Sequence, residues 1–178
     1  MIIRDATADD MAAVATIYGR EVLEGTATFE DAPPSSQTMV ERLAGVRRLG
    51  LHWLVAEIDG QVAAYAYASP FRLRSAYRYA VETSVYVAEG FRGRGLGRAL
   101  VQALIDRCRA SGLRQMIAAI SNNDSNVSII LHERLGFRLA GVYHRVGWKF
   151  DRWIDVTLMQ LDLDPDAGPP EGPGLNLG

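Results

Sequence analysis

The sequence predicts an α/β (α+β) domain in which a central mixed sheet of about seven strands is flanked by about four helices. Strand-like and helix-like periodicities follow one another in the order β-α-α-β-β-β-α-β-α-β-β. The length of 178 residues and the hydrophobic content of 48% are those of one globular domain with a full core. A glycine-rich turn at 90–97 joins a strand to a helix near the middle of the chain, and the other elements are arranged around it.

The first part of the chain predicts an edge strand at 1–4 followed by two helices. Thr7 and Asp10 have the spacing of a capping box, which opens the first helix, and Gly25 ends it. The serine pair at 35–36 caps the second helix. Apolar residues at helical spacing are expected to face the core: Met11, Val14, Ala15, Tyr18, Val22, Met39, Leu43 and Val46.

A loop at 25–34 separates the two helices and carries an aromatic residue beside an acid. One interpretation is that Phe29 anchors the loop in the core. The other is that Phe29 and Glu30 line a substrate site, since functional residues are common on loops. The sequence leaves both interpretations open.

Three strands and a helix are predicted in the middle of the chain. Asp59-Gly60 is a two-residue hairpin signal between strands at 53–58 and 61–69, and a third strand covers 81–87. The helix after the glycine-rich turn ends at Gly112. Its expected buried face consists of Leu96, Leu100, Ala103, Leu104 and Cys108.

The last third of the chain predicts three strands and one helix, with Gly136 ending the helix. We assign residues 1–163 to one domain and 164–178 to a flexible Pro/Gly-rich tail, which is expected to be mobile or to pack only on a neighbour. The elements are a strand at 115–120, a polar turn at 122–126, a helix at 127–135, a strand at 137–143, a loop at 144–152 and a strand at 153–161.

The glycine-rich turn has the character of an anion site. Its N–H groups have no helical partner, and the dipole of the following helix favours negative charge. Arg92, Arg94 and Arg98 add positive charge. A Walker A loop is excluded because Arg98-Ala99 stands where Lys and Ser/Thr are required, and a dinucleotide fingerprint is excluded because Arg98 replaces its last glycine. An ordinary strand-to-helix turn remains the alternative.

The bulk composition restricts the partners and the compartment. A net charge of −2 argues against binding to nucleic acid or to an anionic membrane. The single cysteine, Cys108, excludes an internal disulfide and is expected in the core. No apolar run has the length of a membrane span, there is no signal-peptide pattern, and no metal site is expected. We expect a cytoplasmic protein.

Several short motifs are spread along the chain. They are Glu82 on the strand before the turn, Arg92-x-x-Gly95-x-Gly97 within it, and the segments 131–137 (LHERLGF), 70–77 (PFRLRSAY), 81–87 (VETSVYV) and 147–155 (GWKFDRWID). Together they resemble the Gcn5-related N-acetyltransferase (GNAT) superfamily. The last three resemble the branch of phosphinothricin and methionine sulfoximine N-acetyltransferases in particular. The resemblance covers about residues 2–161.

The resemblance implies the GNAT fold, with a splay between strands 4 and 5, and acetyl-CoA as cosubstrate. The pantetheine arm is then expected to lie between the splayed strands as a false strand, and the turn is expected to bind the pyrophosphate. The implied acetyl-CoA-binding residues are Val85, Tyr86, Val87, Arg92, Gly93, Arg94, Gly95, Leu96, Gly97, Arg98, Asn126 and Ser128.

The resemblance also implies two catalytic residues. Glu82 is expected to accept a proton from the substrate ammonium through a water molecule. The alternative is an ion pair between Glu82 and Arg72 or Arg74, which would lower the pKa of Glu82. His132 stands where many relatives have a tyrosine that protonates the leaving thiolate. It is either that acid or an ordinary surface or packing residue. Cys108 is not expected to carry the acyl group, because this family transfers it directly.

The acceptor is expected to be a small amino acid. If the chain is extended at Arg72 and Arg74, both guanidinium groups project to one side and form a carboxylate clamp; the alternative is a solvated basic loop. By resemblance the acceptor is phosphinothricin, methionine sulfoximine or methionine sulfone. The remaining expected substrate-binding residues are Phe29, Glu30, Tyr77, Thr83, His144 and Trp148.

The resemblance further implies a homodimer. Two other functions remain open. One is acetylation of a polyamine or of a peptide or protein N-terminus, although Arg72 and Arg74 disfavour a polyamine. The other is a sensor that binds acyl-CoA without turnover, which the presence of Glu82 disfavours.

Overall fold

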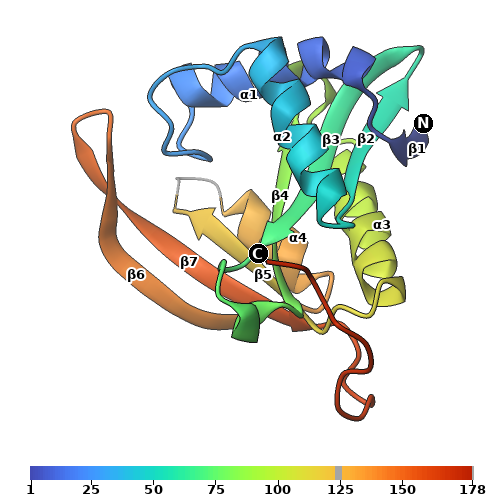
Figure 1. The fold of residues 1–178 in the computed structure, drawn as a ribbon. Helices are drawn as coiled ribbons and strands as arrows, with labels where there is room; N and C mark the ends of the chain where they lie inside the picture. The colour runs from blue at the N-terminus through green and yellow to red at the C-terminus, as the bar shows by residue number, and fades with distance from the viewer. Residues whose placement is uncertain (123–125, 178) are drawn as a thin grey trace.

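A mixed sheet forms the centre of the computed structural model, which describes residues 1–122 and 126–177 (Figure 1). Within these residues the sheet has seven strands in the order β1-β2-β3-β4-β5-β7-β6, and only β4 and β5 pair in parallel. The predicted fold class is therefore confirmed. The strands are β1 (Ile2–Asp5), β2 (Trp53–Ile58), β3 (Gln61–Pro70), β4 (Ala80–Val87), β5 (Gln115–Ser121), β6 (Arg138–Lys149) and β7 (Arg152–Asp162).

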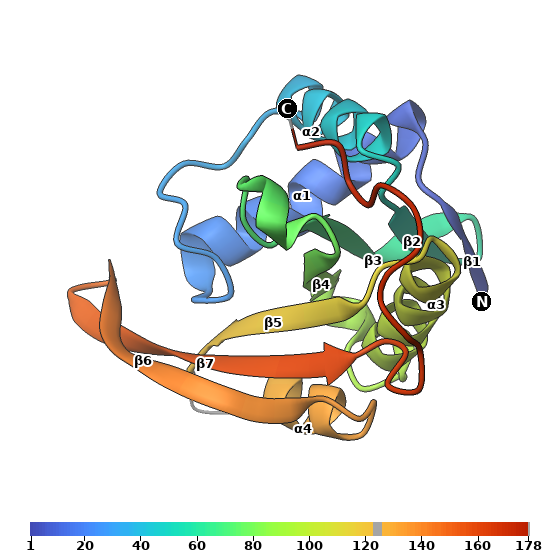
Figure 2. The ribbon, with the colours of Figure 1, turned by 60° about the horizontal axis from the view of Figure 1, so that its bottom comes forward.

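Helices cover both faces of the sheet. Figure 2 shows α1 and α2 on one face and α3 and α4 on the other. No helix among the described residues has both the length and the apolar composition of a membrane span. The helices are α1 (Met11–Glu24), α2 (Ser36–Arg48), α3 (Leu96–Ala110) and α4 (Val127–Glu133), with short 3-10 turns at η1 (Ala8–Asp10), η2 (Ser75–Tyr77) and η3 (Glu89–Phe91).

The local signals in the first half of the chain act as predicted. Thr7 and Asp10 form the capping box, and the Ser35 side chain accepts a hydrogen bond from the Thr38 N–H at 3.1 Å. Asp59 and Gly60 both have positive φ, as a tight hairpin between twisted strands requires. The predicted inward positions of α1 and α2 are buried except Ala15, which is half-buried.

The parallel strands β4 and β5 separate after three residues. Pairing is confined to Ala80–Glu82 against Gln115–Ile117, although both strands continue beyond it. Figure 2 shows β5 turning away from β4 and running alongside β7. The splay between strands 4 and 5 is therefore confirmed. It leaves one edge of β4 from Thr83 to Val87 without a strand partner among the described residues.

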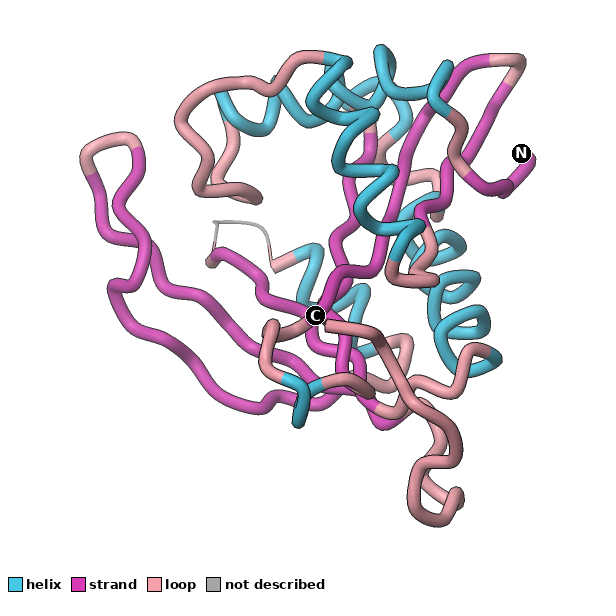
Figure 3. Tube along the Cα trace, in the orientation of Figure 1, coloured by secondary structure: helices cyan, strands magenta, loops and turns pink. Residues whose placement is uncertain are grey.

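The segment predicted as a loop at 144–152 is a hairpin, so that prediction is wrong. β6 continues to Lys149, the chain reverses at Phe150 and Asp151, both with positive φ, and β7 begins at once. A bulge between Tyr143 and Gly147 interrupts the register. A bulge breaks the two-residue alternation of side chains, so the alternating sequence pattern stops at the bulge although the strand continues beyond it. The long hairpin projects from the rest of the molecule (Figure 3).

The helix α4 is shorter than the predicted 127–135. It ends at Glu133, and Gly136 takes positive φ after it, in the expected terminating role. Of the polar turn predicted at 122–126, Asn123, Asp124 and Ser125 lie outside the described residues.

The Pro/Gly-rich tail lies against its own domain, which differs from the expectation that it packs only on a neighbour. The Leu175 N–H donates to the Arg78 carbonyl at 2.8 Å, the Tyr79 hydroxyl donates to the Gly172 carbonyl, and Leu175 is only 9% exposed. Leucines in an otherwise polar segment supply the apolar contact. The tail thereby supports the chain just before β4 (Figure 1), while its mobility stays a prediction.

We expect Gly174→Ala to detach the end of the tail. Gly174 has φ +67, and an added Cβ would lie 2.8 Å from the Arg78 carbonyl oxygen, so alanine is both strained and in collision. Thermal unfolding should show a lower melting temperature, by a few degrees for a loss of about 1 kcal/mol. Gly168→Ala is the control because Gly168 has open space around it. Equal melting temperatures for the two variants would contradict the docking of the tail.

Candidate active site

A cavity of about 270 Å³ lies in the gap between the splayed strands. It reaches through the sheet, because its walls come from both faces and from α4. We call it the splay cavity. It is lined by Ala27, Thr28, Tyr67, Glu82, Thr83, Ser84, Val85, Tyr86, Ala118, Ala119, Ile120, Ser121, Ser128 and His132.

Alternation along β4 decides which side chains face each end of this cavity. Val85 and Val87 face α3, since a Cβ on Gly97 would lie within 4 Å of both. Tyr86 faces the opposite layer, where its ring contacts Tyr18 of α1 at 5.2 Å between centroids. Glu82 shares the face of Tyr86, so its carboxylate lies on the α1–α2 side.

The Glu82 carboxyl is suited to accept a proton. It is half-buried in the splay cavity, and burial raises its pKa, while the charge of Arg72 opposes the rise. Within the described residues Glu82 forms no ion pair, so the alternative of a carboxylate paired with Arg72 or Arg74 is not observed. A base with a raised pKa takes up a proton near neutral pH more readily than an ordinary carboxylate.

His132 is buried at the α4 end of the same cavity, with 2% exposure. Its Nδ1 lies 2.7 Å from the Ser128 carbonyl oxygen, which can only accept a hydrogen bond. Nδ1 therefore carries the proton in the neutral ring, and Nε2, which has no hydrogen-bond partner among the described residues, presents a lone pair. Burial lowers the pKa of His132, so the neutral ring dominates at pH 7. This geometry favours an acceptor at Nε2 and disfavours the general acid predicted from the sequence.

We expect nitrogen-15 NMR at pH 7 to show His132 with a protonated Nδ1 and a bare Nε2. The ring should remain neutral as the pH falls below 6.5, because its pKa is lowered. The exposed His144 provides the comparison signal within the same protein. A protonated Nε2 at pH 7 would contradict this expectation and would support His132 as the general acid.

The glycine-rich turn has the backbone that an anion site requires. Gly93 and Gly95 have φ of 77° and 78°, and Gly95 immediately precedes α3. The three arginines differ in their surroundings: Arg92 is ion-paired with Glu21, Arg94 lies over the Phe91 ring at 5.1 Å, and Arg98 is exposed. The N–H groups at the start of α3, together with Arg94 and Arg98, are thus available to a phosphate.

The backbone from Thr83 to Val87 fits the pantetheine arm of acetyl-CoA. Within residues 1–122 and 126–177 this edge has no partner strand, so its N–H and C=O groups are open to a ligand. The Thr83 hydroxyl is also buried without a hydrogen-bond partner among the described residues. Ser128 lines the splay cavity, whereas Asn126 is exposed and precedes α4 with φ 47°.

The Arg72–Arg74 segment is not extended as the clamp prediction assumed. It bends and enters η2, and both arginines are exposed. The Arg72 guanidinium donates to the Phe71 carbonyl and lies over the Phe71 ring, which also contacts Tyr77 edge-on at 5.6 Å. The proline before Phe71 ends β3 and releases the chain from the sheet. Binding of a carboxylate by these arginines stays a prediction.

The other residues expected to bind the acceptor lie on the loop between α1 and α2 or on the β6–β7 hairpin. Phe29 is 41% exposed and packs over Gly147 of β6, so it does not anchor its loop in the core. Glu30 is held by Arg42 through two hydrogen bonds of 2.8 and 3.1 Å. His144 pairs with Asp155 on the hairpin, and Trp148 contacts Trp153 there, so neither lines the splay cavity.

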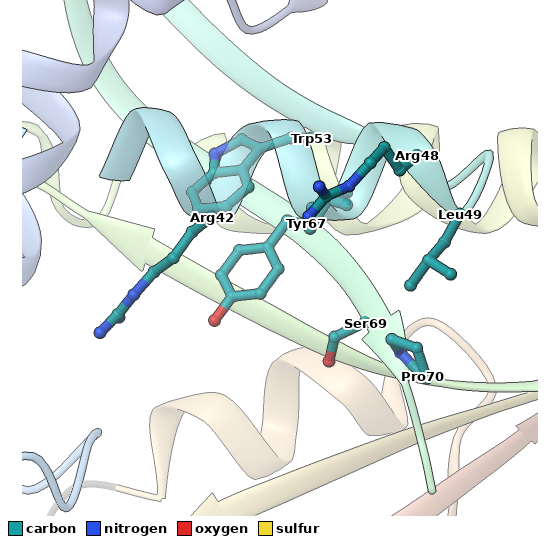
Figure 4. Close-up of a pocket in the computed structure, with 9 residues that line it drawn as sticks. Arg42, Arg48, Leu49, Trp53, Tyr67, Ser69 and Pro70 are labelled. Carbon is teal, nitrogen blue, oxygen red and sulfur yellow. The ribbon is translucent and has the colours of Figure 1, made fainter. Parts of the chain in front are cut away.

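A second cavity of about 410 Å³ lies beside the first, between α2 and the sheet, and Figure 4 shows the side chains around it. We call it the α2 pocket. No sequence pattern marks its residues as functional, because each of them fits an ordinary amphipathic helix or strand. It is lined by Arg42, Gly45, Val46, Arg48, Leu49, Trp53, Tyr67, Ser69 and Pro70.

Cys108 is fully buried on α3, and burial raises its pKa to about 12. A thiol in this state is protonated at neutral pH and unreactive. The prediction of a core cysteine is confirmed.

Comparison with known proteins places this geometry in a family. The pattern of the Acetyltransferase (GNAT) family matches residues 17–137. A phosphinothricin N-acetyltransferase of Alcaligenes faecalis is 46% identical over 163 residues, covering 92% of this chain and 81% of that protein. An L-methionine sulfoximine/L-methionine sulfone acetyltransferase of Pseudomonas aeruginosa is 42% identical over 169 residues, covering 94% and 98%.

A solved structure has the same fold. It is a GNAT superfamily phosphinothricin acetyltransferase from Sinorhizobium meliloti in complex with AcCoA. The TM-score is 0.92 at 42% sequence identity, and the match covers 97% of this chain and 94% of that chain.

Proposed function

The chain belongs to the GNAT family of acetyltransferases, and we propose that it moves the acetyl group of acetyl-CoA to the α-amino group of phosphinothricin, methionine sulfoximine or methionine sulfone. The relatives named for these acceptors support the proposal. The observation that carries it is the half-buried Glu82, with its raised pKa, in the splay cavity that would receive the thioester.

The reaction begins with removal of a proton from the acceptor. An α-ammonium group has no lone pair, so it must lose a proton before it attacks. Glu82 takes this proton, through a water molecule, on the α1–α2 side of the sheet. The amine nitrogen then bonds to the thioester carbon and releases its remaining extra proton to solvent. The carbon–sulfur bond breaks, and the products are an amide and the thiolate of CoA.

The residues around the gap hold acetyl-CoA and stabilise charge. Backbone N–H groups of the open β4 edge, near Val85 and Val87, face negative charge that develops on the thioester oxygen. Gly93 to Arg98 at the start of α3 hold the pyrophosphate. His132 accepts a hydrogen bond at Nε2 from the bound substrate. In the neutral form it has no proton at this atom for the thiolate, which then takes its proton from solvent.

Thiol release from acetyl-CoA tests the proposal directly. The acceptor panel contains methionine sulfoximine, methionine sulfone, phosphinothricin, methionine, spermidine and a short peptide. Fast turnover on the first three supports the proposal, and Arg74→Ala should then raise KM more than it lowers kcat if the clamp exists. Preference for spermidine or the peptide would contradict an amino-acid acceptor and indicate a polyamine or a peptide N-terminus instead. Binding of acetyl-CoA without any thiol release would favour a sensor.

We also propose a homodimer, built on the β6–β7 hairpin. The hairpin exposes an unusual amount of apolar surface, and such surface usually marks an interface. Sedimentation at micromolar concentration should give twice the chain mass, and a monomer would contradict the proposal. A cytoplasmic location stays a prediction. The exposed apolar residues are Leu139, Val142, Tyr143, Val146, Trp148, Phe150 and Trp153.

A further inference from the structure

The α2 pocket borders the proposed base along one face of the sheet. Ser69 is paired with Glu82, and Tyr67 is paired with Ser84, so their side chains lie on the same face. Tyr67 lines both the α2 pocket and the splay cavity. An acceptor with its amino group at Glu82 therefore has a neighbouring cavity directly beside it.

The walls of the α2 pocket are rigid and mainly apolar. Trp53 and Tyr67 stack with 4.3 Å between their ring centroids, and Trp53 is 3% exposed. Leu49 and Pro70 add further apolar lining. A short chain of methylene groups fits such walls better than a polar or branched polar group.

Each polar side chain of the α2 pocket can donate a hydrogen bond, and no carboxylate stands among the residues that line it. Arg42 is neutralised by Glu30, whereas Arg48 has no ion pair among the described residues. Figure 4 shows Arg48 reaching back along α2 toward Tyr67, and the hydroxyls of Tyr67 and Ser69 on the side away from α2. The buried Trp53 Nε1 also has no partner in the described part of the chain. These groups suit oxygen atoms that carry negative or partial negative charge.

We infer that the α2 pocket receives the side chain of the acceptor amino acid, with its oxygen-rich head at Arg48 and its methylene groups against Trp53 and Tyr67. The inference rests on the proposed function and adds to it the place where the side chain is selected. It also assigns the selection to α2 and β3 rather than to His144 and Trp148 of the hairpin.

Filling the pocket tests the inference. Gly45 lies on α2, and an added Cβ meets only Arg48, at 3.8 Å, so Gly45→Leu should fold and occupy part of the pocket. Ala44→Leu is the matched control, because Ala44 is exposed on the same helix and does not line the pocket. Each variant is mixed with phosphinothricin and acetyl-CoA separately, and the rise in melting temperature is measured without requiring turnover.

We expect phosphinothricin to stabilise wild type and Ala44→Leu but not Gly45→Leu, while acetyl-CoA stabilises all three. Equal stabilisation of Gly45→Leu by phosphinothricin would overturn the inference. So would a wild type that phosphinothricin, methionine sulfone and methionine sulfoximine all fail to stabilise. Failure of the proposed function is seen separately, as absent thiol release by a wild type that binds these acceptors.

The role of Arg48 has its own readout. Arg48→Gln should raise KM for phosphinothricin at least threefold more than KM for methionine sulfone, because only the phosphinate carries a full negative charge. Arg138→Gln, an exposed change on β6, is the control. Equal changes for the two acceptors would remove Arg48 from the site.

Discussion

Glu82→Gln is expected to lower kcat by about 10²- to 10⁴-fold, the usual contribution of a positioned general base. Glutamine keeps the size of the side chain but cannot accept the proton of the acceptor ammonium. Binding of acetyl-CoA should remain, because Glu82 does not belong to the open β4 edge or the glycine-rich turn. Steady-state kinetics of thiol release measure the loss, with the exposed Glu133→Gln as control. A loss of less than about fivefold would assign the proton to another group.

The pH dependence of the wild type gives the same residue a second signature. Because burial raises the pKa of Glu82, kcat/KM should begin to fall at a higher pH than an ordinary carboxyl would produce as the solution is acidified. This acid limb should be absent from the residual activity of Glu82→Gln. A limb retained in that variant would report a different base.

Stability should change in the opposite direction to activity. A carboxyl with a raised folded-state pKa stabilises the protein fully below its unfolded pKa, and this contribution is lost as the pH rises through the folded pKa. Above that pH the wild type holds a half-buried carboxylate that has no ion pair in the described part of the chain, whereas Glu82→Gln holds a neutral amide. We therefore expect the variant to melt at a higher temperature at pH 8, with a smaller difference at pH 4. A catalytic group held at a cost to stability is typical of an active site.

Local chemistry explains why most of the fold could be predicted from the sequence. The capping box at Thr7, the Asp59-Gly60 hairpin and the spacing of apolar residues on α3 each act over a few residues, so their signals are short and complete. The extension of β6 past Tyr143 was missed for the opposite reason. There the pairing with β7 holds a bulged, exposed strand whose side chains no longer alternate.

The candidate site could be predicted only in part. Glu82 and the glycine-rich turn lie within one continuous stretch, and the resemblance identified both. Arg48, Trp53 and Ser69 come together only when α2 packs over β3, so no spacing in the sequence connects them. The tautomer of His132 depends on its distance from a backbone carbonyl in the preceding turn, which no residue pattern encodes.

Gly95→Val is expected to raise KM for acetyl-CoA by about 5- to 30-fold, the factor that corresponds to 1–2 kcal/mol. Gly95 has φ +78 at the residue before α3, and a left-handed conformation costs an L-residue about 1–2 kcal/mol, with β-branched valine at the upper end. The strain is relieved only if the turn moves and withdraws its N–H groups from the pyrophosphate. A Cβ at Gly95 meets no atom within 4 Å, so the effect comes from the backbone rather than from collision.

Gly90→Val separates this backbone requirement from a general disturbance of the turn. Gly90 lies in the same turn with open space around it, but it does not have positive φ. Valine there should leave KM for acetyl-CoA within about twofold of wild type, since no left-handed strain is introduced. KM for the acceptor should change little in both variants, because the α2 pocket and Glu82 lie on the other face of the sheet. Equal effects at the two glycines would mean that valine disturbs the turn irrespective of φ, and the anion site would then lie elsewhere on α3.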